Sequence, residues 1–90
     1  MKIIFRVHAI QRMFERKITA AEIRTLLGNG EIIEKYPDDT HYPSRFVLGW
    51  SDTRPLHIVV DDNVEDSEWV IVTVYQPDPE QWNADFKRRK

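Results

Sequence analysis

The stretch Pro55-Leu-His-Ile-Val-Val-Asp61, followed after a polar turn by Glu68-Trp-Val-Ile-Val-Thr-Val-Tyr75, decides the fold of this chain. Both runs are short and rich in β-branched residues, and the segment between them is mostly Asp, Asn, Glu and Ser. This is the pattern of two strands joined by a turn. Two similar runs precede them, at residues 31–36 and 45–50. The second half of the chain therefore predicts an antiparallel meander.

The first third of the chain predicts one short strand and two helices. After an apolar strand at residues 3–7, the apolar spacing changes to i, i+3, i+4, which is typical of an amphipathic helix over residues 8–16. The side chains on its apolar side are Ala9, Ile10, Met13 and Phe14. A second helix is expected to begin at the capping-box sequence Thr19-Ala-Ala-Glu22 and to stop at Gly28-Asn-Gly30.

The end of the chain combines a helix start with a basic tail. Asp78-Pro-Glu-Gln81 offers an N-cap, a proline at the first helical position and a capping partner, so a short C-terminal helix is expected before the basic tail Lys87–Lys90. The predicted architecture is one α+β domain over residues 1–90. Its two N-terminal helices pack on one face of a four- to five-stranded antiparallel sheet.

Strand alternation sorts this sheet into two faces. Leu56, Ile58 and Val60 point one way, and Val70, Val72 and Val74 are their expected counterparts on the last strand. These aliphatic sides are expected to meet the helices. The side chains predicted to be buried are Ile10, Phe14, Ile23, Leu27, Ile58, Val72 and Val74.

Composition excludes several functional classes. The chain has no cysteine, which excludes a disulfide framework, an iron–sulfur cluster and a cysteine nucleophile. The formal net charge of −2 argues against a wholesale nucleic-acid coat protein. No pair among His8, His41 and His57 has the i, i+4 spacing of metal ligands, so neither a metal nor a cofactor is expected. Without a long apolar run, a cytoplasmic protein that does not contact a membrane is expected.

Polar residues gather at two places on the predicted fold. His8, Arg12 and Arg16 share one stripe of the first helix, opposite its apolar side. His57, Thr73 and Tyr75 share the sheet face away from the predicted core. Arg45 would join them if its strand pairs in the expected order.

Histidine, arginine and tyrosine, without a cysteine or a dense carboxylate cluster, suit chemistry on a phosphodiester. Metal-independent RNA cleavage, in which the ribose 2′-hydroxyl attacks the adjacent phosphate, needs a base near neutral pKa, an acid, and cations for the phosphorane charge. His57 and His8 are candidates for the proton transfers, and Tyr75 for stacking on an unpaired base. The plainer interpretation is a solvated helix face with ion pairs and a hydrogen-bonded strand histidine.

Four segments in combination resemble the small bacterial family called domain of unknown function 4258. They are an H-A-x-x-R-x-x-x-R helix at residues 8–16, G-E-I-I-E-x-Y-P at 30–37, a P-L-H strand at 55–59 and T-V-Y-x-P-D at 73–78. The resemblance implies a fold similar to the barnase and RelE-type toxin ribonucleases, and pairing with a small zinc-finger or helix-turn-helix antitoxin. The polar residues that match are His8, Arg12, Arg16, Tyr36, Arg45, His57, Thr73 and Tyr75.

Two functional hypotheses follow. The first is a metal-independent endoribonuclease, the toxin of a type II toxin–antitoxin pair. Its expected catalytic residues are His57, His8, Tyr75 and Thr73, and its expected RNA-binding residues are Arg12, Arg16, Arg45 and Tyr36. The second is a non-catalytic module that holds a protein or RNA on the same face. The expected partners are RNA, an antitoxin protein and, because three tryptophans sit in so small a domain, a second copy in a homodimer.

Overall fold

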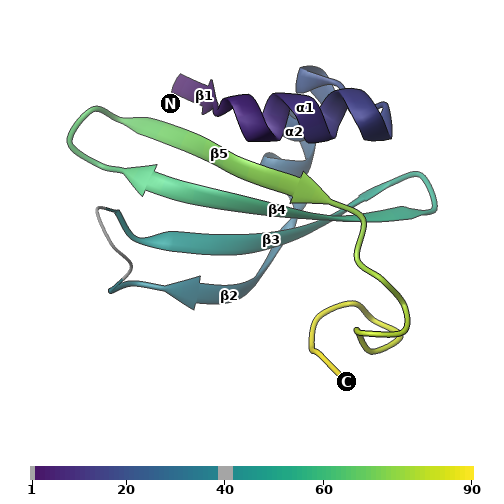
Figure 1. Cartoon of the computed structure of the whole chain (residues 1–90). Helices are drawn as coiled ribbons and strands as arrows, with labels where there is room; N and C mark the ends of the chain where they lie inside the picture. Colours follow the sequence, from purple (N-terminus) through teal and green to yellow (C-terminus); the bar gives the residue numbers. More distant parts are fainter. Residues whose placement is uncertain (1, 39–41) are drawn as a thin grey trace.

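Five strands and two helices make up the computed structural model, which describes residues 2–38 and 42–90. In chain order they are β1 (Lys2–Phe5), α1 (Val7–Arg16), α2 (Ala20–Asn29), β2 (Glu31–Tyr36), β3 (Ser44–Ser51), β4 (Arg54–Asn63) and β5 (Glu68–Tyr75) (Figure 1). The positions of both helices and of the meander strands agree closely with the sequence pattern. His41 lies outside the described residues.

The sheet is mixed, with the strand order β1-β5-β4-β3-β2. Strands β2 to β5 form the predicted antiparallel meander, but β1 pairs in parallel with β5, with Ile4 opposite Val70. The prediction of an entirely antiparallel sheet is therefore wrong at this edge. A hairpin forces its strands to run antiparallel, whereas β1 reaches β5 from the far end of the chain and is free of that constraint.

The predicted C-terminal helix is also wrong. In residues 76–90, which we call the C-terminal segment, the expected cap forms one turn: the Asp78 carbonyl accepts hydrogen bonds from the amides of Gln81 and Trp82, at 3.0 and 3.1 Å. The chain then folds back on itself, and Trp82 pairs with Arg89 as an isolated antiparallel bridge. Because Trp82 is buried by this fold, packing of its ring outweighs local helix signals.

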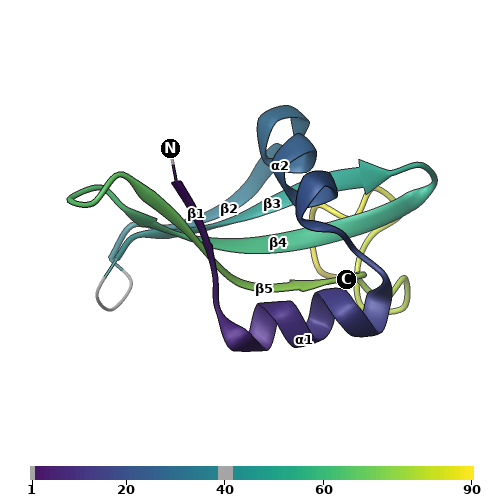
Figure 2. The ribbon, with the colours of Figure 1, turned by 90° about the horizontal axis from the view of Figure 1, so that it is seen from above.

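The two faces of the sheet are covered by different parts of the chain. Both helices lie over one face, which we call the helix face, and the C-terminal segment lies over the other, the tail face (Figures 1 and 2). The main core lies between the sheet and the helices. Its buried members are Ala9, Met13, Ile18, Ile23, Leu26, Leu27, Val47, Leu56, Ile58, Val60, Ile71 and Val74.

Helix α1 uses a different side for this core than its apolar spacing predicts. Ala9 and Met13 are buried, whereas Ile10 is 52% exposed and Phe14 is 87% exposed. The four apolar residues cover a sector of the helix surface that is too wide for all of them to face β5. Because Ala9 is small, the side of the helix that carries it allows the helix backbone to lie close to the sheet. The predicted burial of Ile10 and Phe14 is therefore wrong, while that of Ile23, Leu27, Ile58 and Val74 is confirmed.

A β-bulge corrects the assignment of the last strand. Val59 pairs with Thr73 and Val60 pairs with Ile71, which leaves Val72 without a direct partner. One extra residue in a strand reverses the alternation beyond it. Ile71 is consequently fully buried and Val72 only partly, contrary to the prediction.

Candidate functional site

His57 lies on the tail face and is fully buried. Its Nε2 atom is 2.8 Å from the Phe86 carbonyl oxygen, and its Nδ1 atom is 3.1 Å from the Tyr75 hydroxyl. A carbonyl oxygen can only accept, so Nε2 carries the proton and donates to Phe86. In the neutral ring Nδ1 then accepts from the Tyr75 hydroxyl. Both ring nitrogens are occupied by protein groups.

The C-terminal segment is what covers His57. The Trp82 ring meets the imidazole edge-on, with 4.4 Å between centroids, and the Arg89 guanidinium lies 4.8 Å from the Trp82 ring centroid. The Phe86 ring meets Trp50 of β3 edge-on at 5.9 Å. His57 is thus enclosed between β4 and a cover formed by the Trp82 ring and the Phe86 backbone.

Burial sets the protonation states of the pair. It lowers the pKa of His57 from its ordinary 6.5, and the positive charge of Arg89 acts in the same direction, against the hydrogen bond to Phe86. Burial likewise raises the pKa of Tyr75 above its ordinary 10.0. At neutral pH the structure therefore holds a neutral imidazole against a neutral phenol.

A groove of about 600 Å³ lies beside this pair, between β2, β3 and the C-terminal segment. Its lining is Glu31, Ile32, Ile33, Glu34, Tyr36, Phe46, Trp82, Lys87, Arg88 and Arg89. Tyr36 and Phe46 form an edge-to-face pair at 5.5 Å, and Lys87 forms an ion pair with Glu31 at 3.2 Å. Trp82 belongs both to the groove wall and to the cover of His57. The groove therefore combines aromatic rings with a cationic rim, next to the buried imidazole.

The structure brings four of the predicted site residues to the tail face. His57 and Tyr75 are paired across β4 and β5, and Thr73 lies opposite Val59 on the same strands. Tyr36 lines the groove. His57, Thr73 and Tyr75 are neighbours on two adjacent strands, whereas Tyr36 comes from β2, two strands away from β4.

Arg45 does not join them. It pairs directly opposite Val60, and directly opposed residues share a face, so Arg45 is on the helix face. There its Nε atom contacts both carboxylate oxygens of Asp62, at 3.1 and 3.3 Å, and its guanidinium lies 5.1 Å from the Trp69 ring centroid. The strand that carries Arg45 pairs in the expected order, but the Arg45 side chain lies on the opposite face of the sheet from the one predicted.

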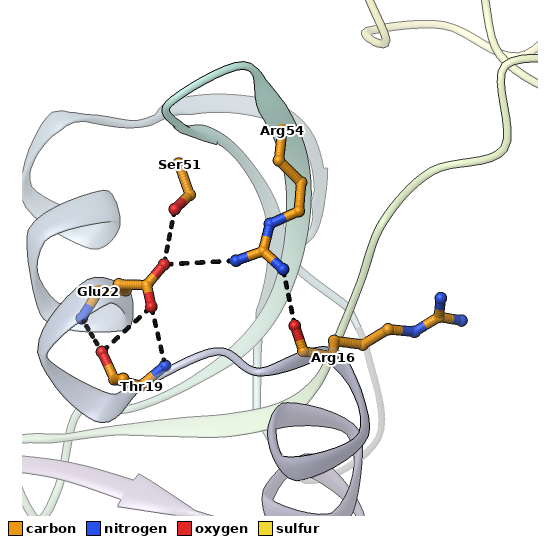
Figure 3. Close-up of polar contacts among 5 residues, drawn as sticks. All are labelled: Arg16, Thr19, Glu22, Ser51 and Arg54. Carbon is orange, nitrogen blue, oxygen red and sulfur yellow. Dashed lines mark hydrogen bonds and ion pairs between the residues drawn. The ribbon is translucent and has the colours of Figure 1, made fainter.

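The stripe of His8, Arg12 and Arg16 is also in the helix layer. His8 is exposed, and Arg12 forms an ion pair with Glu15 at 3.3 Å. The Arg16 side chain points away from the neighbouring polar network, while its carbonyl accepts a hydrogen bond from Arg54 at 2.6 Å (Figure 3). The predicted site residues are thus divided between the two sides of the sheet. One group lies on the tail face, and the other lies on the helix face or on α1.

The network around Glu22 ties both helices to the β3–β4 hairpin (Figure 3). Thr19 and Glu22 form the predicted capping box, and the second Glu22 oxygen accepts from the Ser51 hydroxyl at 2.6 Å and contacts Arg54 at 3.5 Å. The hydrogen bond from Ser51, with those from Thr19, lowers the pKa of Glu22 below its ordinary 4.5. We assign this cluster a structural role, because all its partners are satisfied within the chain.

Sequence reasoning missed the contribution of the C-terminal segment and of Phe46. The sequence pattern predicts Trp82 on a short C-terminal helix and Arg88 and Arg89 in a basic tail. A usable signal was present: Trp82 and Phe86 follow the last strand in a segment that also carries four consecutive basic residues. Aromatic rings among cations are typical of a surface that packs back on the fold or binds an anion.

Comparison with protein families gives one match, to the family described as Domain of unknown function (DUF4258), over residues 5–76. The chain belongs to this family. No curated protein and no solved structure matches. The DUF4258 match includes Tyr36, His57 and Tyr75, while the C-terminal segment lies almost entirely beyond it.

Among residues 2–38 and 42–90 of this DUF4258 member, no helix is long and apolar enough to cross a membrane. Within the same described residues, no group of three or more His, Asp and Glu side chains could hold a metal ion.

Proposed function

We propose that this DUF4258 protein binds single-stranded RNA in the groove between β2, β3 and the C-terminal segment. The observation that carries the proposal is the lining of that groove, which includes three aromatic and three cationic side chains. Single-stranded RNA is recognised in this way, by bases stacked on aromatic side chains and phosphates held by cations.

The aromatic residues provide the stacking surface. Tyr36 is 44% exposed and is supported edge-on by Phe46, so its ring is accessible and also held in place. Trp82 also lines the groove but is buried, with an exposure of 7%. Tyr36 is therefore the more accessible of these two rings for a base.

The charged residues give the groove its polarity. Lys87, Arg88 and Arg89 outnumber Glu31 and Glu34, and Lys87 already neutralises Glu31. Arg88 is exposed and can meet a phosphate, whereas the guanidinium of Arg89 lies over the Trp82 ring. The Glu34 carboxylate is an acceptor for the amino group of a base, which would favour RNA over a simple polyanion.

Fluorescence anisotropy with a labelled single-stranded oligoribonucleotide tests the binding. Tyr36→Ala should weaken binding about 5- to 150-fold, since one stacked base is worth about 1–3 kcal/mol. Arg88→Ala should also weaken binding. It should reduce the slope of log affinity against log salt concentration by about one, which corresponds to the loss of one phosphate contact. Phe14→Ala and Arg24→Ala are matched controls on the helices, where both side chains are exposed.

The result that overturns the proposal is equal binding by all four variants, or binding with no salt dependence. Wild-type protein that leaves the anisotropy unchanged would exclude the groove as an RNA site. Circular dichroism of each variant checks that the fold is intact.

A second candidate function, RNA cleavage as expected for a toxin of a toxin–antitoxin pair, is favoured by the position of His57 directly behind the Trp82 wall. For this chemistry Trp82 and Phe86 must move aside, which frees Nε2 of the imidazole from the Phe86 carbonyl. The imidazole proton then sits on Nδ1, which donates to the Tyr75 hydroxyl oxygen, so that Nε2 takes the 2′-hydroxyl proton. O2′ attacks phosphorus, and the departing 5′ oxygen takes a proton from a water molecule. The products are a 2′,3′-cyclic phosphate and a 5′-hydroxyl.

Cleavage is tested with end-labelled RNA in the presence of a chelator. His57→Gln should reduce the rate by about 10²- to 10⁴-fold, because general acid–base catalysis is lost. Lys17→Ala, an exposed substitution at the end of α1, serves as the control. Binding without any cut product in wild-type protein would leave the binding module as the function.

A further inference from the structure

Few side chains anchor the C-terminal segment to the rest of the fold. Pro77 and Trp82 are buried and Phe86 is partly buried, whereas every other residue from 76 to 90 is exposed. Among the described residues, the buried core between the sheet and the helices includes none from this segment. The DUF4258 match also ends at residue 76, the first residue of the segment. The segment can therefore leave the sheet without opening the main core.

The backbone of Phe86 is strained in the arrangement that covers His57. Its φ is 60°, in the left-handed region, where the Cβ atom of any residue other than glycine crowds a carbonyl oxygen. Such strain persists only where surrounding contacts maintain it. Here the contacts are the hydrogen bond from His57 Nε2 to the Phe86 carbonyl, at 2.8 Å, and the edge-on packing of the Phe86 ring on Trp50. The closed position is thus held by these contacts and opposed by the backbone of Phe86.

The remaining contacts of the segment differ in strength. The Trp82 ring packs edge-on against the buried imidazole of His57, with 4.4 Å between centroids. The ion pair between Lys87 and Glu31 joins side chains that are 43% and 57% exposed, so solvent screens it. The closed position therefore depends mainly on Trp82 and Phe86.

We propose that the C-terminal segment is an autoinhibitory cover, which closes over His57 and Tyr75 and opens locally while the main core stays folded. In the closed state neither nitrogen of His57 can meet an external group, because Phe86 and Tyr75 occupy both. Opening removes the Phe86 carbonyl and the Trp82 ring together, since both belong to the segment. Segments with few buried contacts open in this way at a lower cost than the whole fold.

The functional consequence of the cover rests on the proposed function. Lys87, Arg88 and Arg89 line the RNA groove and belong to the segment, so the closed state completes the groove. The open state exposes His57 for RNA cleavage. RNA binding in the groove and cleavage at His57 thus require different positions of the segment. The test of the cover contains no RNA, so its failure is distinct from a failure of the RNA proposals.

Modification of histidines by diethyl pyrocarbonate tests the opening, because this reagent acylates a neutral imidazole nitrogen that it can reach. Mass spectrometry of the full chain after digestion gives the rate at each histidine, with the exposed His8 as internal reference. His57 of wild-type protein should react at least about tenfold more slowly than His8, since only the open population reacts.

Variants at the two anchors should favour the open state. Trp82→Ala and Phe86→Ala should each raise the rate at His57, relative to His8, by about fivefold or more, because each loses an aromatic contact. Phe14→Ala, which removes an exposed ring from α1, should leave the relative rate unchanged. Circular dichroism checks that each variant is folded.

Phe86→Gly isolates the backbone strain. It lacks the ring, as Phe86→Ala does, but glycine adopts a φ of 60° without crowding. His57 should therefore react about threefold or more slowly in Phe86→Gly than in Phe86→Ala.

Met13→Ala distinguishes local opening from global unfolding. It weakens the main core on the other face of the sheet, so the rate at His57 relative to His8 should remain that of wild type. Acceleration in Met13→Ala as large as in Phe86→Ala would overturn the proposal, because the exposure of His57 is then global. Wild-type rates at His57 in both Trp82→Ala and Phe86→Ala, or equal rates in Phe86→Gly and Phe86→Ala, would also contradict it.

Discussion

Phe14 shows at the scale of one residue how a helical pattern can be right while its interpretation is wrong. The i, i+3, i+4 spacing correctly predicts a helix, but it does not state which part of a wide apolar sector faces the sheet. Ala9 and Met13 take that place, and Phe14 is 87% exposed. Periodicity alone therefore does not show which of the apolar residues of a helix are buried.

This placement predicts opposite outcomes for two adjacent residues. Phe14→Ala should change the free energy of unfolding by no more than about 0.5 kcal/mol, as expected for a surface substitution. Met13→Ala should lower it by about 2–5 kcal/mol, because it opens a cavity in the core. Urea denaturation of both variants decides the point, and a larger loss for Phe14→Ala would place Phe14 in the core after all.

His57 predicts a pH dependence of stability. Its pKa is lowered in the folded protein, so the unfolded chain binds a proton first as the pH falls through about 6.5. The stability that the neutral imidazole contributes is thus present above that pH and is lost as the pH falls from it toward the folded pKa.

We expect wild-type protein to lose more stability than His57→Gln between about pH 7.5 and about pH 5.5, above the range in which most carboxylates titrate. The measurement is the free energy of unfolding in urea at both pH values. Equal losses in the two proteins would mean that His57 is not held neutral by the fold.

At the scale of elements, α2 is the part that local sequence determines best. Its N-terminus carries both hydrogen bonds of the capping box, and the same carboxylate reaches Ser51 and Arg54. Local signals and tertiary contacts agree here, and the predicted and observed helix starts coincide. The C-terminal segment is the opposite case. Its capping residues are present, but no helix follows them, because Trp82 packs against the sheet instead.

Thr19→Ala should therefore cost about 1 kcal/mol of stability, which is the usual contribution of an N-cap. Thr25→Ala, the same substitution on an exposed turn of the same helix, should cost little or be slightly stabilising. Thermal unfolding of both variants gives the comparison. A similar melting temperature for the two would show that the capping box does not hold the start of α2.

Glu22 also affects the stability of the protein at acid pH. The pKa of Glu22 is lowered in the folded state, so its contribution is present above the ordinary pKa of 4.5 and is lost as the pH falls through its folded pKa. Glu22→Gln should reduce stability at neutral pH and flatten the acid side of the stability profile. An unchanged acid profile in Glu22→Gln would contradict the assignment.

At the scale of the whole molecule, the site was predicted only where alternation is unbroken. His57 and Tyr75 were correctly placed together, because each lies next to a buried aliphatic residue on a regular stretch of strand and therefore points to the opposite face of the sheet. The position of Arg45 required knowledge of which face its strand presents, which the pairing with Val60 decides. Arg88 and Arg89 reach the groove through a turn that no periodicity describes.

The fold of the whole chain also explains why His57 is neutral. Trp82 and Phe86 exclude water from the imidazole, so a smaller side chain at position 82 should hydrate it. In Trp82→Leu the pKa of His57 should rise toward 6.5, and Phe14→Leu, at a residue 87% exposed on α1, should leave it unchanged. An NMR titration of the imidazole protons measures both variants. The same pKa in Trp82→Leu and in wild type would show that the sheet alone buries His57, and removal of the C-terminal segment would then not expose a base for RNA cleavage.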